Sequence, residues 1–233
     1  TGVTVSGIEA GATWQYSTNG GTTWSTGTGS SFSLASNGSY AAGAIQVRQT
    51  DAAGNVSSNG QNAQAWTVDS TGPVVSSVAI SGATGLANST LNAGDVVSVT
   101  VTMDSVTLVT GTPQLTLNIG GTPVQANYVS GSGSTALVFS YTILASQTDA
   151  NGISMDANAL SLNGGSLKDA AGNSASITHA AVTDNAGYKV DTTAPSALTV
   201  SLAADTGTAG DFITSNTGVT VSGIEAGATW QYS

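Results

Sequence analysis

The sequence contains no cysteine and a single histidine, His179. Disulfides, thiolate metal sites and cysteine nucleophiles are therefore excluded, and one histidine cannot form a histidine metal cluster within one chain. Basic residues are nearly absent too, because Arg48, Lys168 and Lys189 stand against thirteen acids for a net charge of −10. We therefore expect no nucleic-acid partner, since the chain lacks the positive surface that phosphates require.

Charged residues of both signs make up only 7% of the 233 residues, where about 25% is usual for soluble domains. No run of 18 apolar residues occurs, so the sequence predicts no membrane insertion. Serine (32), threonine (34) and glycine (30) are abundant instead. Apolar residues still reach 39% and come in β-branched runs, which favours a folded extracellular β protein over a disordered chain.

Short segments of alternating or continuous apolar character recur along the whole chain. They lie at 3–5, 13–16, 31–34, 44–48, 96–102, 113–119 and 135–144. Gly- and Asn-rich turn clusters separate these segments every 8–12 residues, as at 19–21 and 130–133. This spacing predicts an all-β protein of tandem immunoglobulin-like antiparallel β-sandwich modules that lack the disulfide.

Residues 1–17, TGVTVSGIEAGATWQYS, recur without a change as residues 217–233, an offset of 216. Identity over so many consecutive residues indicates a tandem array with a 216-residue period. A weaker repeat divides this period in two. The pentapeptide Asp-Ala-Ala-Gly-Asn occurs at 51–55 and 169–173, and it precedes the related linkers VDSTGP (68–73) and VDTTAP (190–195).

The two repeats together predict the organisation of the chain. Residues 1–70 are expected to be the C-terminal part of an immunoglobulin-like module, and 71–191 a complete longer module. Residues 192–233 are expected to be the N-terminal part of the next copy of the first module.

Aspartate supplies eleven of the thirteen acids, and much of it lies in turns near the expected module ends. A single Asp or Asn in a turn is ordinary, because its side chain caps its own backbone. Carboxylates gathered without counter-charges nevertheless favour a hard cation, and Ca²⁺ takes carboxylate and carbonyl oxygens at flexible geometry. The candidate calcium ligands are Asp51, Asn55, Asp69, Asp169, Asn173, Asp184, Asp191, Asp205 and Asp211.

The stretch QTDAAGN (49–55) followed by VDSTGP resembles the bacterial immunoglobulin-like repeats of giant RTX-type cell-surface adhesins. LNAGDVVSVTVT (91–102), GTPQLTLNIGG (111–121), KDAAGN and KVDTTAP in the longer module are similar to repeats of the same proteins. The resemblance implies an extender on the bacterial cell surface, with neighbouring repeats as partners and calcium at module junctions. It places Asp51, Asn55 and Asp69 at one junction, and Asp169, Asn173 and Asp191 at the next.

We therefore interpret the sequence as a non-catalytic, calcium-stiffened stalk segment of an adhesin, a protein of cell adhesion and biofilm. No nucleophile and base can be assembled, and His179 lies in a strand-like segment. An Asp pair is the remaining enzymatic option, and nothing singles one out.

Two alternatives from other classes stay open. In a self-assembling filament or surface-layer subunit, residues 196–216 of one copy would complete residues 1–70 of the next by strand exchange. In a glycan-binding module, Trp14, Tyr16 and Trp24 would form a stacking platform. The sequence around Trp24, STNGGTTW (17–24), argues against the glycan-binding alternative. It resembles the Asp-box hairpin of sialidases, in which the Trp packs under a turn.

Overall fold

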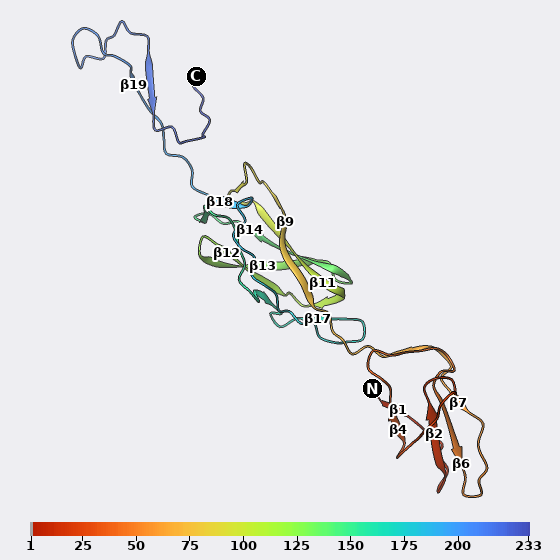
Figure 1. The fold of residues 1–233 in the computed structure, drawn as a ribbon. Coiled ribbons are helices and arrows are strands. Elements are labelled where there is room, and N and C mark those ends of the chain that lie inside the picture. Colours follow the sequence, from red (N-terminus) through yellow and green to blue (C-terminus); the bar gives the residue numbers. More distant parts are fainter. Residues whose placement is uncertain (1) are drawn as a thin grey trace.

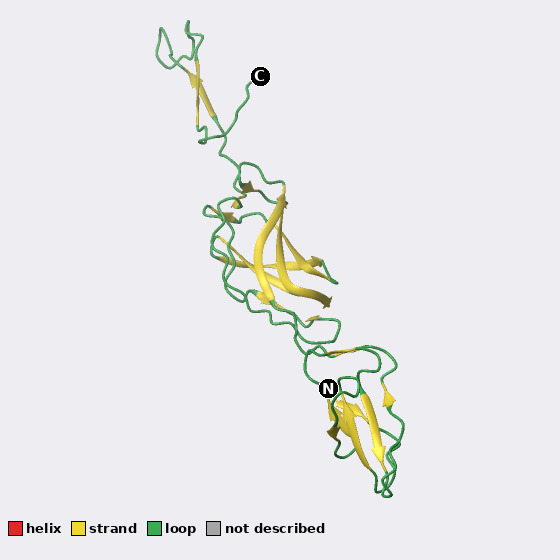
Figure 2. Ribbon diagram, turned by 45° about the vertical axis from the view of Figure 1, so that its right-hand side comes forward, coloured by secondary structure: helices red, strands yellow, loops and turns green. Residues whose placement is uncertain are grey.

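A computed structural model describes residues 2–233, and its strand pairings fall into three groups that follow the chain. We call residues 2–70 the first unit, 74–191 the central unit and 196–233 the last unit. The three units follow one another end to end along an elongated molecule (Figure 1). No helix occurs within residues 2–233 (Figure 2), so the expected all-β sandwich class is confirmed.

The first unit is a small sandwich of short strands. One sheet has the order β3-β2-β6-β7, and the pairs β1-β4 and β5-β8 lie apart from it. Its strands are β1 (Gly2–Thr4), β2 (Thr13–Ser17), β3 (Ser25–Thr26), β4 (Ser31–Ser33), β5 (Ser39–Tyr40), β6 (Gln46–Thr50), β7 (Gly60–Gln61) and β8 (Trp66–Thr67). Its core is correspondingly small: the buried residues are Trp14, Phe32, Leu34, Tyr40, Ile45 and Val68.

The central unit holds the larger sheet, in the order β16-β12-β13-β14-β11-β17, with β9 also paired to β11. A second sheet has the order β10-β18-β15. The strands are β9 (Val75–Thr84), β10 (Thr90–Leu91), β11 (Val96–Thr110), β12 (Gln114–Ile119), β13 (Thr122–Ser130), β14 (Ser134–Thr142), β15 (Thr148–Asp149), β16 (Leu160–Ser161), β17 (Ser166–Lys168) and β18 (Lys189–Asp191).

The long strand β11 shows why this sequence forms a sandwich. Val97, Val99, Val101 and Met103 are buried, and the residues between them are only partly covered. That period of two places one face of the strand in the core, which continues through β12 and β14. One pairing departs from the antiparallel expectation, because β10 and β18 run parallel.

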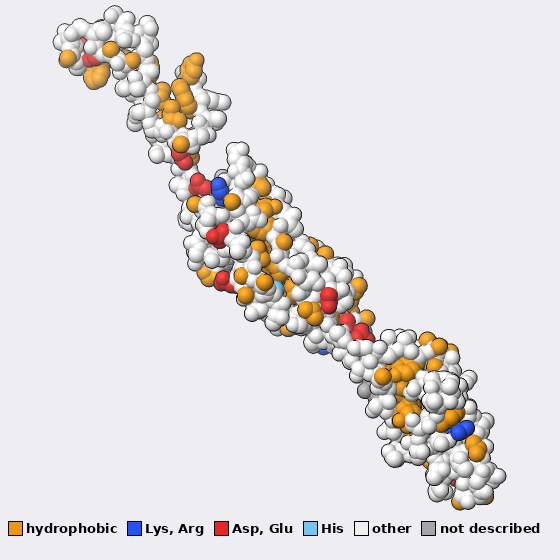
Figure 3. All heavy atoms as spheres, viewed as in Figure 1, with side chains coloured by type: hydrophobic (Ala, Val, Ile, Leu, Met, Phe, Trp, Pro, Cys, Tyr) orange, Lys and Arg blue, Asp and Glu red, His pale blue; other side chains and the backbone are white. Residues whose placement is uncertain are grey.

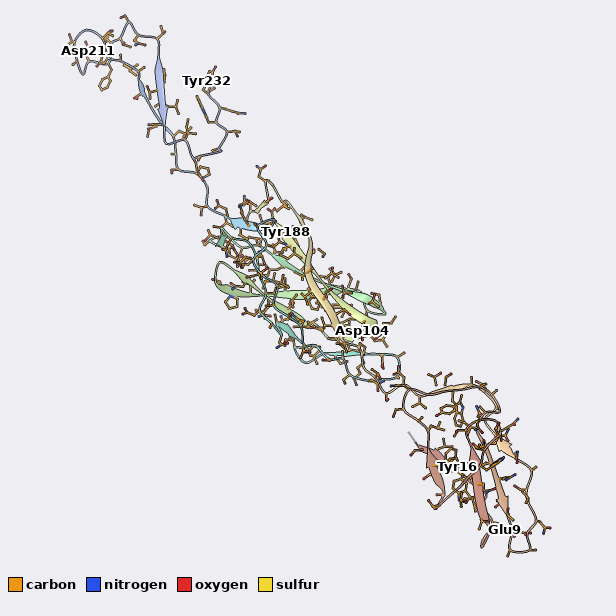
Figure 4. The ribbon with its side chains drawn as sticks, viewed as in Figure 1. Glu9, Tyr16, Asp104, Tyr188, Asp211 and Tyr232 are labelled. Carbon is orange, nitrogen blue, oxygen red and sulfur yellow. The ribbon has the colours of Figure 1, made fainter. Side chains whose placement is uncertain are left out.

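The last unit is one hairpin, in which β19 (Thr199–Leu202) pairs with β20 (Val219–Ser222). None of its residues is buried, and large apolar side chains such as Phe212 (79% exposed) and Tyr232 (90%) face solvent. Figure 4 shows Tyr232 projecting from the end of the chain. Two strands alone cannot cover an apolar face, so this unit has no core of its own.

Candidate module junction

The two Asp-Ala-Ala-Gly-Asn loops fold in the same way. In the first unit, one carboxylate oxygen of Asp51 accepts hydrogen bonds from the backbone N–H groups of Ala53 (2.9 Å) and Asn55 (2.8 Å). Its other oxygen accepts the Asn55 side-chain amide at 2.8 Å. In the central unit, Asp169 makes the equivalent bonds to the backbone and side chain of Asn173, both at 2.8 Å. Each aspartate therefore closes its own loop.

These hydrogen bonds also favour the ionised form of the two aspartate side chains. The side-chain amide of Asn55 is the largest influence on Asp51, and that of Asn173 the largest on Asp169, and each lowers the pKa of its carboxyl group. Backbone N–H donors act in the same direction, because a donor stabilises the ionised form of the acid. Both loops therefore carry a negative charge at neutral pH.

The loop of the central unit lies against the linker that enters that unit. The Asn173 amide donates to the backbone carbonyl of Asp69 at 3.1 Å. Just beyond, the Ser176 N–H donates to the carbonyl of Pro73 (2.8 Å), and the Val75 N–H donates to the carbonyl of Ser176 (3.2 Å). These hydrogen bonds hold the linker against the central unit, which follows it in the sequence.

Gly72 makes the closest approach in this contact. A Cβ atom on Gly72 would lie 2.0 Å from the carbonyl oxygen of Ser174, which is far inside van der Waals contact. Only glycine lets the two backbones come this close. The second linker has Ala194 at the matching position.

The loop of the first unit lies at the opposite end of its unit, away from the linker. Gln49, two residues before Asp51, accepts the backbone N–H of Glu9 at 2.8 Å, and Figure 4 places Glu9 at the end of the molecule far from the central unit. The expectation that Asp51, Asn55 and Asp69 share one junction is therefore wrong. The intervening chain, with β7 and β8, returns along the unit before the linker begins.

In the central unit too, residues that were expected to share a junction lie at opposite ends of the unit. The Asp169–Asn173 loop faces the incoming linker, whereas Asp191 ends β18, which pairs with β15, and Thr192 next to it donates to the carbonyl of Gln147 at 2.9 Å. Figure 1 shows β17 and β18 at opposite ends of the unit. Asp169 and Asn173 therefore do not share a junction with Asp191. The structure instead brings together Asp69 of one unit and the 169–173 loop of the next.

The two linkers share a local turn. Asp69 accepts the backbone N–H of Thr71 at 3.0 Å, and Asp191 accepts that of Thr193 at 2.9 Å. Each carboxylate uses one oxygen in this Asx turn, and its second oxygen makes no hydrogen bond within residues 2–233. This free oxygen is available for a further ligand.

The carboxylates of the remaining candidate ligands accept hydrogen bonds from nearby groups of their own unit. Asp184 accepts the side-chain amide of Asn151, Asp205 accepts the backbone N–H of Gly210 (2.8 Å), and Asp211 accepts that of Ile213 (2.9 Å). Among residues 2–233 no three acidic or histidine side chains gather closely enough to hold a metal ion by themselves. Any cation here would need backbone or amide oxygens as well.

Asp104 belongs to the junction although the sequence gives no signal for it. Its carboxylate accepts the backbone N–H of Val74 at 2.8 Å, and its own N–H donates to the Val74 carbonyl at 2.9 Å. It lies in the middle of β11, at the end of the central unit that faces the first unit (Figure 4). Its position becomes apparent only once β9 and β11 are paired.

The aromatic residues of the first unit do not form an open platform. Trp14 is only 4% exposed, and Tyr16 stacks on Phe32 with ring centroids 4.1 Å apart. Trp24 is covered by the guanidinium of Arg48, 4.0 Å from its ring centre. Trp14 is thus part of the core, and Tyr16 and Trp24 each have one ring face covered, so a sugar-stacking role for these residues stays a prediction.

Trp24 instead completes the expected hairpin. Its indole N–H donates to the carbonyl of Gly21 at 3.0 Å, and the Asn19 side chain accepts the N–H of Thr23 at 3.0 Å. The turn joins β2 to β3, as the Ser-Thr-Asn-Gly-Gly sequence predicts. The indole therefore packs beneath the turn.

His179 makes ordinary structural contacts. The backbone N–H of Leu160 donates to its Nε2 atom at 3.3 Å. Its Nδ1 atom lies 2.8 Å from the carbonyl oxygen of Ala180. Both ring nitrogens thus face the backbone. No helix long and apolar enough to cross a membrane is found within residues 2–233.

Comparisons with known proteins add little. No protein-family model and no curated protein matches the chain. Among solved structures, chitinase ChiA74 from Bacillus thuringiensis is similar at 15% identity and a TM-score of 0.20. The match covers 78% of this chain and 27% of the chitinase chain, and a likeness at that TM-score supports no inference about fold or activity.

Proposed function

We propose that this chain is a segment of a non-catalytic stalk, built from immunoglobulin-like modules joined head to tail on a bacterial cell surface. The observation that carries the proposal is the contact between the linker of one unit and the Asp-Ala-Ala-Gly-Asn loop of the next, made by motifs that recur in both modules. A 216-residue repeat that reproduces both motifs would reproduce the contact along an array.

We further propose that calcium stiffens this junction. Asn173 donates one amide hydrogen to the Asp69 carbonyl and another to the Asp169 carboxylate, so two oxygens converge on its side chain. Turning the amide by half a rotation would present its own oxygen to the same place. Asp69, Asp169 and Asn173 would then supply oxygens of the kind Ca²⁺ prefers. Bound calcium would offset the negative charge at this end of the unit.

The surface charge is consistent with this location. Figure 3 shows acidic side chains of the central unit near the end that faces the first unit. Lysine and arginine supply only three positive charges against thirteen acids, so protein groups leave a net charge of −10 unbalanced. A cation at the junction would reduce the repulsion between adjacent carboxylates.

The test compares flexibility and melting with calcium and with a chelator. Calcium should raise the melting temperature and straighten the chain in small-angle X-ray scattering, because the ion binds only the ordered junction. Asn173→Ala should remove both effects. Asn55→Ala is the matched control, since it changes an identical loop that touches no linker in this chain. Identical melting and scattering curves with and without calcium would refute the calcium proposal, and the stalk proposal would then rest on the linker contact alone.

A further inference from the structure

The second linker repeats the turn of the first. Asp191 accepts the Thr193 N–H at 2.9 Å, as Asp69 accepts the Thr71 N–H at 3.0 Å. A proline follows two residues later in both linkers. The backbone carbonyl of Asp191 is therefore presented by the same local structure as the Asp69 carbonyl, which accepts the Asn173 amide.

The loop of the first unit repeats the loop of the central unit beyond the shared pentapeptide. The Ser57 N–H donates to the Gln49 carbonyl at 2.9 Å. The Ala175 N–H likewise donates to the Leu167 carbonyl, also at 2.9 Å. Since backbone groups alternate between the two sides of an extended segment, the next N–H is directed to the other side. In the central unit that group belongs to Ser176, which donates to the linker.

Two residues of the first unit thus match the central residues that bind the linker. Asn55 matches Asn173, and Ser58 matches Ser176. The Asn55 amide gives one hydrogen to Asp51, whereas its second hydrogen and the Ser58 N–H make no hydrogen bond within residues 2–233. The matching two donors are those by which the central unit holds its own linker.

The linkers differ at the point where linker and loop come closest. Gly72 in the first linker is replaced by Ala194 in the second. A Cβ atom on Gly72 would lie 2.0 Å from the Ser174 carbonyl oxygen. Because non-bonded heavy atoms do not approach closer than about 3 Å, a linker with alanine at this position must lie about 1 Å or more farther from its loop.

We propose that, in the array, the Asp-Ala-Ala-Gly-Asn loop of the first unit holds the second linker of the preceding repeat, and that close and wide joints alternate along the stalk. The close joint is the observed contact at Gly72. The wide joint contains Ala194. In it the Asn55 amide faces the Asp191 carbonyl, and the Ser58 N–H faces the linker proline. This inference rests on the proposed stalk function and specifies the partner of one surface in that stalk.

The extra separation affects how the stalk bends. The direct hydrogen bond from Asn173 to Asp69 is already 3.1 Å long, and a hydrogen bond stretched beyond about 3.5 Å is lost. The matching groups of the wide joint are therefore joined through water rather than directly. Bending of the array is then concentrated at every second joint.

Hydrogen exchange in a longer chain tests the docking. Because residues 217–233 are identical to 1–17, adding residues 18–70 after residue 233 continues the repeat without foreign sequence. The extended chain contains the first unit twice, and a linker precedes only the second copy. The peptide containing Ser58 should therefore show two equal populations in mass spectrometry, one of them exchanging at least about tenfold more slowly.

Two substitutions test the difference between the joints. Ala194→Gly removes the obstructing Cβ, so it should slow exchange further in the protected Ser58 population and leave the Ser176 peptide unchanged. Gly72→Ala is the reciprocal control, which should speed exchange at Ser176 and leave Ser58 unchanged. A general gain in stability of the second copy cannot produce this pattern, since glycine by itself makes a linker more flexible.

A single exchange population for the Ser58 peptide would overturn the docking. Faster or unchanged exchange after Ala194→Gly would overturn the alternation of close and wide joints. Neither result affects the stalk proposal, because its calcium response is measured at Asn173 in the close joint.

Discussion

At the scale of single residues, the junction depends on one glycine and one asparagine. Gly72 permits the close approach of two backbones, and Asn173 links the carboxylate of its own loop to the carbonyl of the preceding linker. Neither role can be derived from the local sequence. The identical loop at 51–55 makes the same internal hydrogen bonds and contacts no linker within residues 2–233, so only the position of each loop in its unit distinguishes them.

Gly72→Ala is expected to loosen the junction. The added Cβ would overlap the Ser174 carbonyl, and relieving that overlap should cost about 1–3 kcal/mol. Chemical denaturation of the central unit and scattering of the whole chain would measure the loss. Gly82→Ala serves as the control, because a Cβ there meets no atom within 4 Å. Equal stability of the two variants would show that the linker can move away without cost.

Acid should weaken both loops. The pKa values of Asp51 and Asp169 are lowered in the folded chain, and the unfolded value is about 3.9. The stabilisation is therefore present in full above about pH 4 and disappears as the pH falls through the lower folded values.

Melting temperatures between pH 7 and pH 2 would measure this loss. Asp169→Asn and Asp51→Asn should each melt lower at pH 7 and show a smaller decline in acid. Asp156→Asn should behave like the unmodified chain, because Asp156 is exposed and its carboxylate makes no hydrogen bond within residues 2–233. If acid lowers the melting temperature of the Asp169 and Asp51 variants as much as that of the unmodified chain, other carboxylates cause the decline.

At the scale of strands, the hydrophobic pattern predicts much of the fold. The segments expected at 96–102, 113–119 and 135–144 overlap β11, β12 and β14, and the turn before Trp24 forms the expected hairpin. Period-two patterns report which face is buried, but they carry no information about which strands pair. The parallel pairing of β10 with β18 and the place of Asp104 beside Val74 both depend on long-range contacts. The candidate junction is for the same reason only partly predictable: the sequence shows its motifs, but it does not show at which end of its unit each motif lies.

Leu117→Ala tests the independence of the cores. Leu117 is fully buried in β12 and packs only in the core of the central unit, so its truncation should cost about 2–5 kcal/mol. Calorimetry should show separate transitions for the first and central units, and only the larger should move. Val106→Ala, at a site 54% exposed, should shift neither transition appreciably. A single transition that moves as a whole would mean that the two units unfold cooperatively.

At the scale of the whole molecule, the central unit has an entry end and an exit end. The incoming linker and the Asp-Ala-Ala-Gly-Asn loop lie at one end, and the outgoing linker leaves from the other. The elongated outline in Figure 1 follows directly from this polarity, since a linker that leaves opposite its point of entry carries the next unit farther away.

This polarity has a consequence for how such a protein can change over generations. In the proposed stalk, insertion or deletion of one 216-residue period would keep the order of units and create no new kind of contact. The length of the stalk could therefore vary by duplication or loss of gene segments, while each junction between units kept its own strength. Stalk length and junction strength would then be inherited separately, so selection could change one of them without changing the other.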